Sequence, residues 1–270
     1  MKKVYTSLII VFLLLLAGCG AAQADLKTAT GKTESRTLSG EASSLLVESV
    51  LLYLKGENTG PRVELVSDGG AARAELSGQS DVLDKLNFSL SGDTLKLSGP
   101  GNIRFAVSEE LTLSLYNYSP EKIRLSGGCH LKAGELEKPH ITMDLSGAAS
   151  ASIGKLGAEK LKIDQSGASS LTIEEAALTG GLDLHISGAS SLSIKGKGTE
   201  MFAVITGASR VEAIELELQK TTLTVAGASR LECFITELLG GSISGASTVY
   251  YKGDPELATS VGSSSSLQKK

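Results

Sequence analysis

Apolar and polar residues alternate in short runs through the C-terminal half of the chain, and each run ends at a glycine. Successive glycines are separated by 20, 20, 21, 19, 20 and 18 residues. They are Gly127, Gly147, Gly167, Gly188, Gly207, Gly227 and Gly245. A fixed period of this length is typical of a solenoid, in which each repeat buries its apolar edge against its neighbours.

Within each repeat, the residues two, four and six positions before the glycine are mostly apolar, and those between them are mostly polar. In one coil the apolar positions are Ile141, Met143 and Leu145. This period of two indicates a strand with one face directed inward. The alternation resumes four and six positions after the glycine, so we expect two short strands bent about the glycine corner. A third, looser side would be filled by Leu136, Leu156 and Leu216.

Coils of this kind stack each strand on its counterpart one turn along, which gives a parallel β-helix. Right-handed crossovers are the strong default, so the predicted fold is all-β, a right-handed parallel β-helix with coils of about 20 residues. A leucine-rich repeat would need a recurring asparagine, and none recurs. A serine follows most corner glycines by two positions, and we interpret this row as a structural ladder of hydroxyl hydrogen bonds rather than as nucleophiles. Its members are Ser169, Ser190, Ser209, Ser229 and Ser247.

The N-terminus has the pattern of a bacterial export signal. Two lysines precede an unbroken apolar run from Leu8 to Ala17, which is short for a membrane span. The stretch from Leu16 to Cys19, Leu-Ala-Gly-Cys, is similar to a lipobox, so we expect Cys19 to become the acylated first residue of the mature protein. The alternative is an ordinary cleaved signal that ends at Ala22 or Ala24. The predicted location is extracytoplasmic, on the bacterial cell membrane or outer membrane, with the lipid anchor in the bilayer.

The predicted organisation has four parts. Residues 1–18 form the signal peptide and residues 19–35 a flexible tether. Residues 36–251 form a β-helical domain, whose regular coils span 125–251. Residues 252–270 either cap the last coil or are disordered. Residues 36–125 alternate less regularly, and we interpret them as the first part of the same β-structure.

Charge and cysteine content narrow the possible partners and crosslinks. The formal net charge is −4, and −6 once the two lysines of residues 1–18 are removed. This argues against nucleic acid as a partner, because nucleic-acid-binding proteins carry a basic surface. Cys129 and Cys233 lie about five coils apart, roughly 24 Å at one strand spacing per coil. A disulfide needs Cα atoms within about 7 Å, so we expect both thiols to be free.

Three stretches place the chain near a known family. SRTLSGEASSLLVESVLLYLKGENTGPRVELVSD and VLDKLNFSLSGDTLKLSG are followed by the LSG-x-S-x-L coils. In this order they resemble the putative auto-transporter adhesin, head GIN domain family of bacterial surface proteins, over roughly residues 36–250. The resemblance implies a right-handed β-helical protein that is exported or lipid-anchored and acts in adhesion. It supplies no catalytic residues.

The residues three positions before the glycine form the strongest candidate site. Asp144, Asp164 and His185 occupy this outward position in successive coils. Neighbours in the row would lie about 5 Å apart, which is close enough for two carboxylates to share Ca²⁺ or to contact a glycan. The alternative is a solvated polar face, since we expect no lysine or arginine directed at the row. Arg210 and Arg230 are likewise one coil apart and could form an ion-pair ladder or an anion site.

We therefore expect a non-enzymatic cell-envelope lipoprotein whose β-helical surface adheres to a protein or glycan. No nucleotide-binding, zinc-protease, serine-hydrolase or CxxC pattern occurs, and no cofactor or metal is expected. One alternative is a carbohydrate-active enzyme, a polysaccharide lyase or hydrolase, that uses the acidic positions. Another is a structural or signalling-associated component of the envelope.

Overall fold

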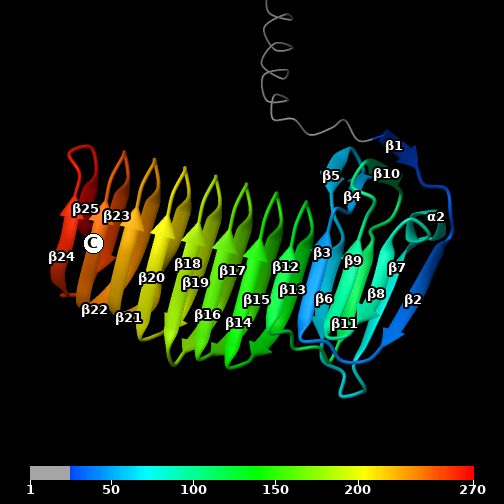
Figure 1. Cartoon of the computed structure of the whole chain (residues 1–270), viewed down its shortest axis with the longest axis horizontal. Helices are drawn as coiled ribbons and strands as arrows, with labels where there is room; N and C mark the ends of the chain where they lie inside the picture. Colours follow the sequence, from blue (N-terminus) through cyan, green and yellow to red (C-terminus); the bar gives the residue numbers. More distant parts are fainter. Residues whose placement is uncertain (1–24) are drawn as a thin grey trace, which may run out of the picture.

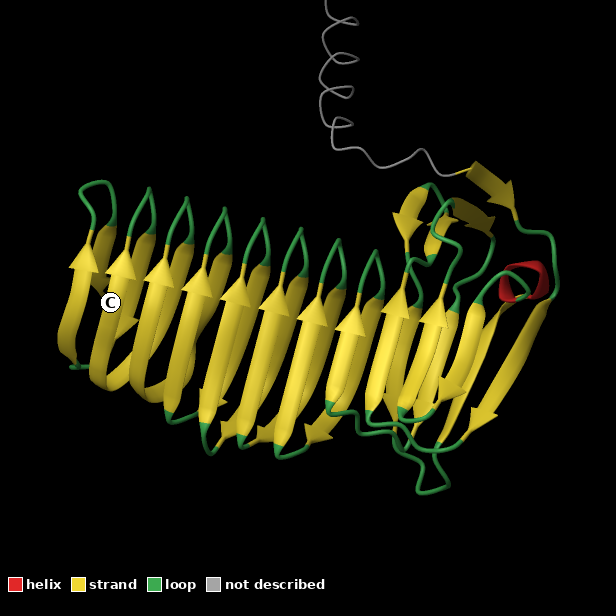
Figure 2. Cartoon of the chain, viewed as in Figure 1, coloured by secondary structure: helices red, strands yellow, loops and turns green. Residues whose placement is uncertain are grey.

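The computed structural model describes residues 25–270. Figure 1 shows a long stack of parallel strands with a less regular region at its N-terminal end. Strands dominate these residues, and one short helix, α2, accompanies them (Figure 2). The predicted signal peptide and Cys19 lie outside the described residues.

The regular stack is built from fourteen strands. They are β12 (Lys122–Leu125), β13 (His130–Glu137), β14 (His140–Leu145), β15 (Ser150–Ala158), β16 (Lys160–Gln165), β17 (Ser170–Leu178), β18 (Gly181–Ile186), β19 (Ser191–Lys197), β20 (Glu200–Ile205), β21 (Arg210–Val225), β22 (Arg230–Ile243), β23 (Thr248–Lys252), β24 (Glu256–Val261) and β25 (Ser266–Lys269).

These strands form two parallel sheets. In the first sheet β12, β14, β16, β18 and β20 pair in succession, and the C-terminal parts of β21 and β22 continue the ladder to β24. In the second sheet β13, β15, β17 and β19 are followed by the N-terminal parts of β21 and β22, then by β23 and β25. The fold is thus the predicted parallel β-solenoid.

The glycine corners join the two sheets. Each corner glycine has a positive φ, for example 69° at Gly147 and 78° at Gly188, a conformation that side chains with a Cβ rarely adopt. The next residue donates its backbone N–H to the glycine one coil before, as Ala168 does to Gly147 at 2.7 Å. A Cβ on Gly167 would lie 2.6 Å from that same carbonyl oxygen. Glycine is therefore needed both for the bend and for the close stacking.

The inward positions fill the interior as the alternation predicts. Ile141, Met143 and Leu145 are buried, and so are their counterparts in the following coils. Leu136, Leu156 and Leu216 are also fully buried. They do not lie on a loose third side, however, because β13 and β15 run on through Leu136 and Leu156. Register shifts, such as the one between Ile173 and Ala176, absorb the extra residues.

The predicted serine ladder is buried and structural, but its hydrogen bonds differ from the expectation. Ser190, Ser209 and Ser229 donate their Oγ hydrogen bonds to the backbone carbonyls three residues earlier, at 2.8, 2.8 and 2.9 Å. A hydroxyl pair along the axis forms between Ser169 and Ser190, at 3.3 Å. The hydroxyls turn to the corner carbonyls because a buried carbonyl oxygen without a donor is costly.

Both described cysteines are free and buried, as predicted. Burial raises the pKa of the Cys129 thiol and of the Cys233 thiol to about 12. They therefore act as small packing groups inside the stack.

The N-terminal region mixes parallel and antiparallel pairing. Its elements are β1 (Asp25–Thr28), β2 (Thr33–Ser39), β3 (Ser44–Glu48), β4 (Leu51–Leu54), β5 (Glu57–Thr59), β6 (Arg62–Val66), β7 (Arg73–Gln79), α2 (Ser80–Leu83), β8 (Asn87–Ser91), β9 (Thr94–Ser98), β10 (Ile103–Val107) and β11 (Thr112–Tyr116). Strand β3 pairs in parallel with β12, and β6 with β13, so both sheets of the stack extend into this region. Strands β2 and β11 pair antiparallel with β7.

Strands continue on both sides of the predicted domain, residues 36–251. Strand β1 pairs with β10, and β2 begins at Thr33 and pairs with β7, so part of the expected tether lies in strands. The sequence did not predict strands β1 and β2, because these polar segments lack apolar alternation. They are strands because they pair with a neighbouring strand edge. At the other end β24 and β25 form a further coil on β22 and β23.

Candidate functional site

The outer face of the first sheet carries the predicted site. Strand alternation turns every second side chain outward, and the parallel register aligns these side chains in rows along the stack. Asp144 pairs with Asp164, and Asp164 with His185. The structure therefore brings the three predicted residues together in one row, which we call the acidic row.

Basic side chains neutralise this row. Arg124 Nε lies 3.1 Å from Asp144 Oδ2, and Lys162 Nζ lies 2.9 Å from Asp164 Oδ2. The expectation that no lysine or arginine faces the acidic row is therefore wrong. Arg124 holds the equivalent position one coil earlier, and Lys162 reaches Asp164 along its own strand. The hydrogen bond with Asp164 is the main reason that the pKa of Lys162 is raised.

His185 completes the cluster. Its Nδ1 lies 3.5 Å from Asp164 Oδ1 and 3.5 Å from Asp183 Oδ1. Among the described residues, no group of three or more histidine, cysteine, aspartate or glutamate side chains is arranged to hold a metal ion. A Ca²⁺ ion between Asp144 and Asp164 would have to displace the guanidinium or the ammonium group, so the ion pairs disfavour a shared cation there.

Two shallow hollows lie side by side on this face. One, of about 510 Å³, is lined by the acidic row together with Arg124 and Thr206. The other, of about 700 Å³, crosses the strands from β14 to β22. We call this larger hollow the Phe202 groove; its outward-facing lining residues are His140, Thr142, Lys160, Lys162, Gly181, Asp183, Glu200, Phe202, Lys220, Thr222 and Leu238.

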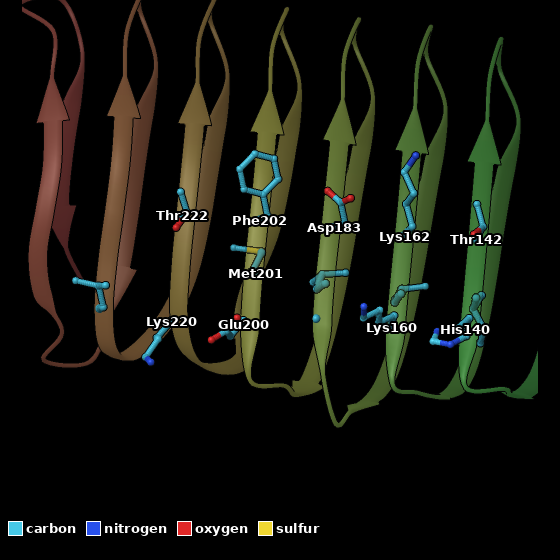
Figure 3. Close-up of a pocket in the computed structure, with 15 residues that line it drawn as sticks. His140, Thr142, Lys160, Lys162, Asp183, Glu200, Met201, Phe202, Lys220 and Thr222 are labelled. Atoms are coloured by element: carbon cyan, nitrogen blue, oxygen red, sulfur yellow. The ribbon is translucent and has the colours of Figure 1, made fainter.

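The Phe202 groove was not identified from the sequence. Figure 3 shows Phe202 between Asp183 and Thr222, in a row that crosses the strands. Phe202 is 47% exposed, and its ring centroid lies 6.2 Å from that of His185, which lines the neighbouring hollow. A usable signal was present: Met201, Ala203 and Ile205 take the inward positions, which places Phe202 outward.

The arginine pair lies on the second sheet. Arg210 and Arg230 are aligned one coil apart, and each contacts a glutamate on its own strand, at 2.5 Å from Glu212 and Glu232. Glu232 also contacts Lys270 at 2.5 Å. Hydrogen bonds from Lys270 and then Arg230 lower the pKa of Glu232. This geometry matches the ion-pair ladder rather than an anion site, because the positive charges already have partners.

Comparisons with known proteins agree with the fold. Among solved structures, a putative adhesin from Parabacteroides merdae is 14% identical, with a TM-score of 0.78 over 92% of this chain and 100% of that one. A second, from Parabacteroides distasonis, is 15% identical, with a TM-score of 0.79 over 91% and 100%. A putative lipid binding protein from the same species is 15% identical, with a TM-score of 0.78 over the same shares.

No curated protein matches the chain. A family model does match, and it covers residues 58–255, a span that includes the regular coils, the acidic row and the Phe202 groove. The chain therefore belongs to the putative auto-transporter adhesin, head GIN domain family.

Proposed function

We propose that this protein is a non-enzymatic lipoprotein of the bacterial cell envelope that binds a protein or glycan on the outer face of its first sheet. The observation that carries the proposal is the pair of adjoining hollows on one broad exposed face, on which Asp144 and Asp164 are already ion-paired. A rigid face of this kind can bind a ligand through many weak contacts without moving. Membership of an adhesin family supports the same role.

The proposed attachment to the membrane is through acyl chains on Cys19. Its position behind Leu-Ala-Gly supports this, and each buried CH₂ of an acyl chain contributes about 0.8 kcal/mol. Within residues 25–270, no helix is long and apolar enough to cross a membrane. Cys19→Ala should release the protein from the membrane fraction of the producing bacterium. Cys233→Ala, which alters a buried cysteine, should leave the protein there; release by both variants, or by neither, would contradict the proposal.

Binding can be tested with a glycan array and with whole cells. We expect the purified protein to bind and the double variant Asp144→Ala with Asp164→Ala to keep binding, because these carboxylates are occupied by Arg124 and Lys162. Absence of binding to any glycan or cell-surface protein would favour the structural or signalling-associated role instead.

One observation keeps the enzyme alternative testable. The hollow at the acidic row places Asp164 and His185 in contact at 3.5 Å, and a carboxylate and an imidazole can act as acid and base. The test is incubation with polysaccharides, followed by assays for new reducing ends and for unsaturated uronic acids. We expect no turnover. Turnover that Asp164→Asn abolishes would replace the binding proposal with a lyase or hydrolase.

A further inference from the structure

We infer that the Phe202 groove binds an uncharged glycan strand and that one sugar ring packs against the Phe202 side chain. The inference rests on the proposed binding function and deepens it by naming the ligand class and the site. It concerns a different row of side chains from the acidic row.

Phe202 is unusual for its position. Between residues 125 and 251, it is the one large hydrophobic side chain among the described residues that is this exposed. It is held in a regular strand, because Met201 and Ala203 on either side are buried. A fixed aromatic ring exposed on a flat sheet can pack against the apolar face of a sugar at little cost in conformational entropy.

Glycines leave space on the sheet beside the Phe202 ring. In the coil before Phe202, Gly181 stands where the neighbouring coils carry Lys160 and Glu200. A Cβ on Gly181 would meet nothing within 4 Å, so the gap is not filled by another part of the molecule. Two coils after Phe202, Gly240 leaves a similar gap, where the nearest atom to a Cβ would be 3.7 Å away. These two glycines leave room for sugar rings on both sides of Phe202.

Polar groups without partners surround the ring. The side chains of Asp183 and Thr222 are its direct neighbours in register. Within residues 25–270, Lys160, Glu200 and Lys220 take part in no ion pair within 4.0 Å. Asp183 Oδ1, by contrast, is a buried atom that faces His185 Nδ1 at 3.5 Å. Sugar hydroxyls both donate and accept hydrogen bonds, so they can satisfy acids, ammonium groups and hydroxyls of this kind.

The charge of the groove favours an uncharged strand over an acidic one. Its lining contains three lysines and two acids, and Lys162 is already paired with Asp164. An acidic polymer would meet Asp183 and Glu200 without a clear surplus of positive charge. The protein as a whole is also negative, at −4, which further disfavours anionic ligands.

The backbone disfavours a peptide strand as the occupant. The floor of the groove is the interior of a parallel sheet, in which β16, β18 and β20 are each paired on both sides. An extended peptide binds a sheet by adding to a free edge, and the groove offers none. The groove instead runs across the strands, where side chains repeat about every 4.8 Å, a spacing close to the length of one sugar unit.

The test uses the purified protein and four soluble polysaccharides: laminarin, mannan and xylan, which are uncharged, and polygalacturonate, which is acidic. Retardation in polysaccharide-containing native gels and titration calorimetry measure binding. We expect binding to at least one uncharged polymer. Raising NaCl should change this binding little, because salt screens interactions between exposed charges and an uncharged polymer offers none. Phe202→Ala should weaken it about tenfold or more, and Phe202→Tyr should keep it.

Tyr53→Ala is the matched control, because Tyr53 is also an exposed aromatic residue, at 36%, but lies in the N-terminal region on β4. It should bind like the unaltered protein. Circular dichroism melts should show that all three variants fold. Unweakened glycan binding by Phe202→Ala, or binding to polygalacturonate alone that salt abolishes, would overturn the inference and leave the proposed function standing. Binding to cells without binding to any uncharged polymer would also overturn the inference and leave the proposed function standing. Failure to bind any glycan or cell would overturn both.

Discussion

A Cβ atom on Gly188 would lie 2.4 Å from the carbonyl oxygen of Gly167 in the coil before. That distance is far inside van der Waals contact, and the φ of Gly188 is 78°. Two independent constraints therefore act on one residue. We expect Gly188→Ala to destabilise the protein by about 1–3 kcal/mol, measured as a fall in the urea midpoint.

Gly134→Ala is the control for this prediction. Gly134 lies in β13 and a Cβ there would meet nothing within 4 Å, so the change should be less than about 1 kcal/mol in either direction. Equal destabilisation by both variants would show that the corner has no special role.

The second prediction concerns pH and Glu232. Hydrogen bonds from Lys270 and Arg230 lower its pKa below the ordinary 4.5, and its side chain is 9% exposed. A carboxyl whose pKa is lowered by folding contributes stability above its unfolded pKa and loses it as the pH falls through the folded pKa. Glu232→Gln should therefore cost about 1–2 kcal/mol at pH 7, with a smaller gap from the unaltered protein below pH ~4.

Urea unfolding at several pH values measures this gap. Glu212→Gln is the control, because Glu212 contacts Arg210 in the same way one coil earlier but is 44% exposed, and exposed pairs contribute little. A gap for Glu232→Gln that stays constant from pH 7 to pH 3 would contradict the assignment.

The third prediction concerns Thr221, an inward residue with an unpaired hydroxyl. Its side chain is 1% exposed, and its Oγ1 has no hydrogen-bond partner among the described residues. Its neighbours in register are Met201 and Leu239. Thr221→Val keeps the shape and removes the buried polar atom, so it should raise stability by about 1 kcal/mol. Thr221→Ser keeps the hydroxyl but loses a methyl group and should lower the melting temperature; the opposite order would refute this explanation.

The fourth prediction concerns thiol reactivity. The thiolate is the reactive form of cysteine, and burial raises the pKa of Cys129 and of Cys233 to about 12. In a Cys19→Ala background, a thiol reagent at pH 8 should therefore label neither residue in the folded protein and both in urea. Rapid labelling of the folded protein would show that the coils open locally.

The repeat alone predicted most of the regular stack. Once Gly147 and Gly167 set the register, the inward positions Met143 and Ile163 followed from alternation, and so did the alignment of Asp144 with Asp164. The ion pair with Arg124 was available from the same alignment, because Arg124 stands three positions before Gly127 and pairs in register with Asp144. The ion pair with Lys162 did not follow, because it depends on how a long side chain bends along its own strand. The antiparallel pairing of β2 and β7 was also beyond the pattern, since neither segment carries the glycine period.

The Phe202 groove escaped prediction from the sequence for a different reason. The outward position of the Phe202 side chain was encoded in the alternation of β20. The space beside that side chain, however, depends on which residues occupy the adjacent outward positions in other coils. Gly181 looks like an ordinary strand residue until β18 is placed beside β20. Sites on a solenoid are combinations of coils, so they are visible only after the coils have been aligned in three dimensions.

The corner glycines also determine how such a protein can change in size. Each corner contacts the glycine of the coil before in the same way, as Gly207 contacts Gly188 and Gly227 contacts Gly207. Inserting or deleting one whole repeat would recreate the same junction, whereas a change of a few residues would break it. A gene duplication of one repeat would therefore lengthen the molecule by one strand spacing, about 4.8 Å, and would move the last coil further from the N-terminal region without altering either end.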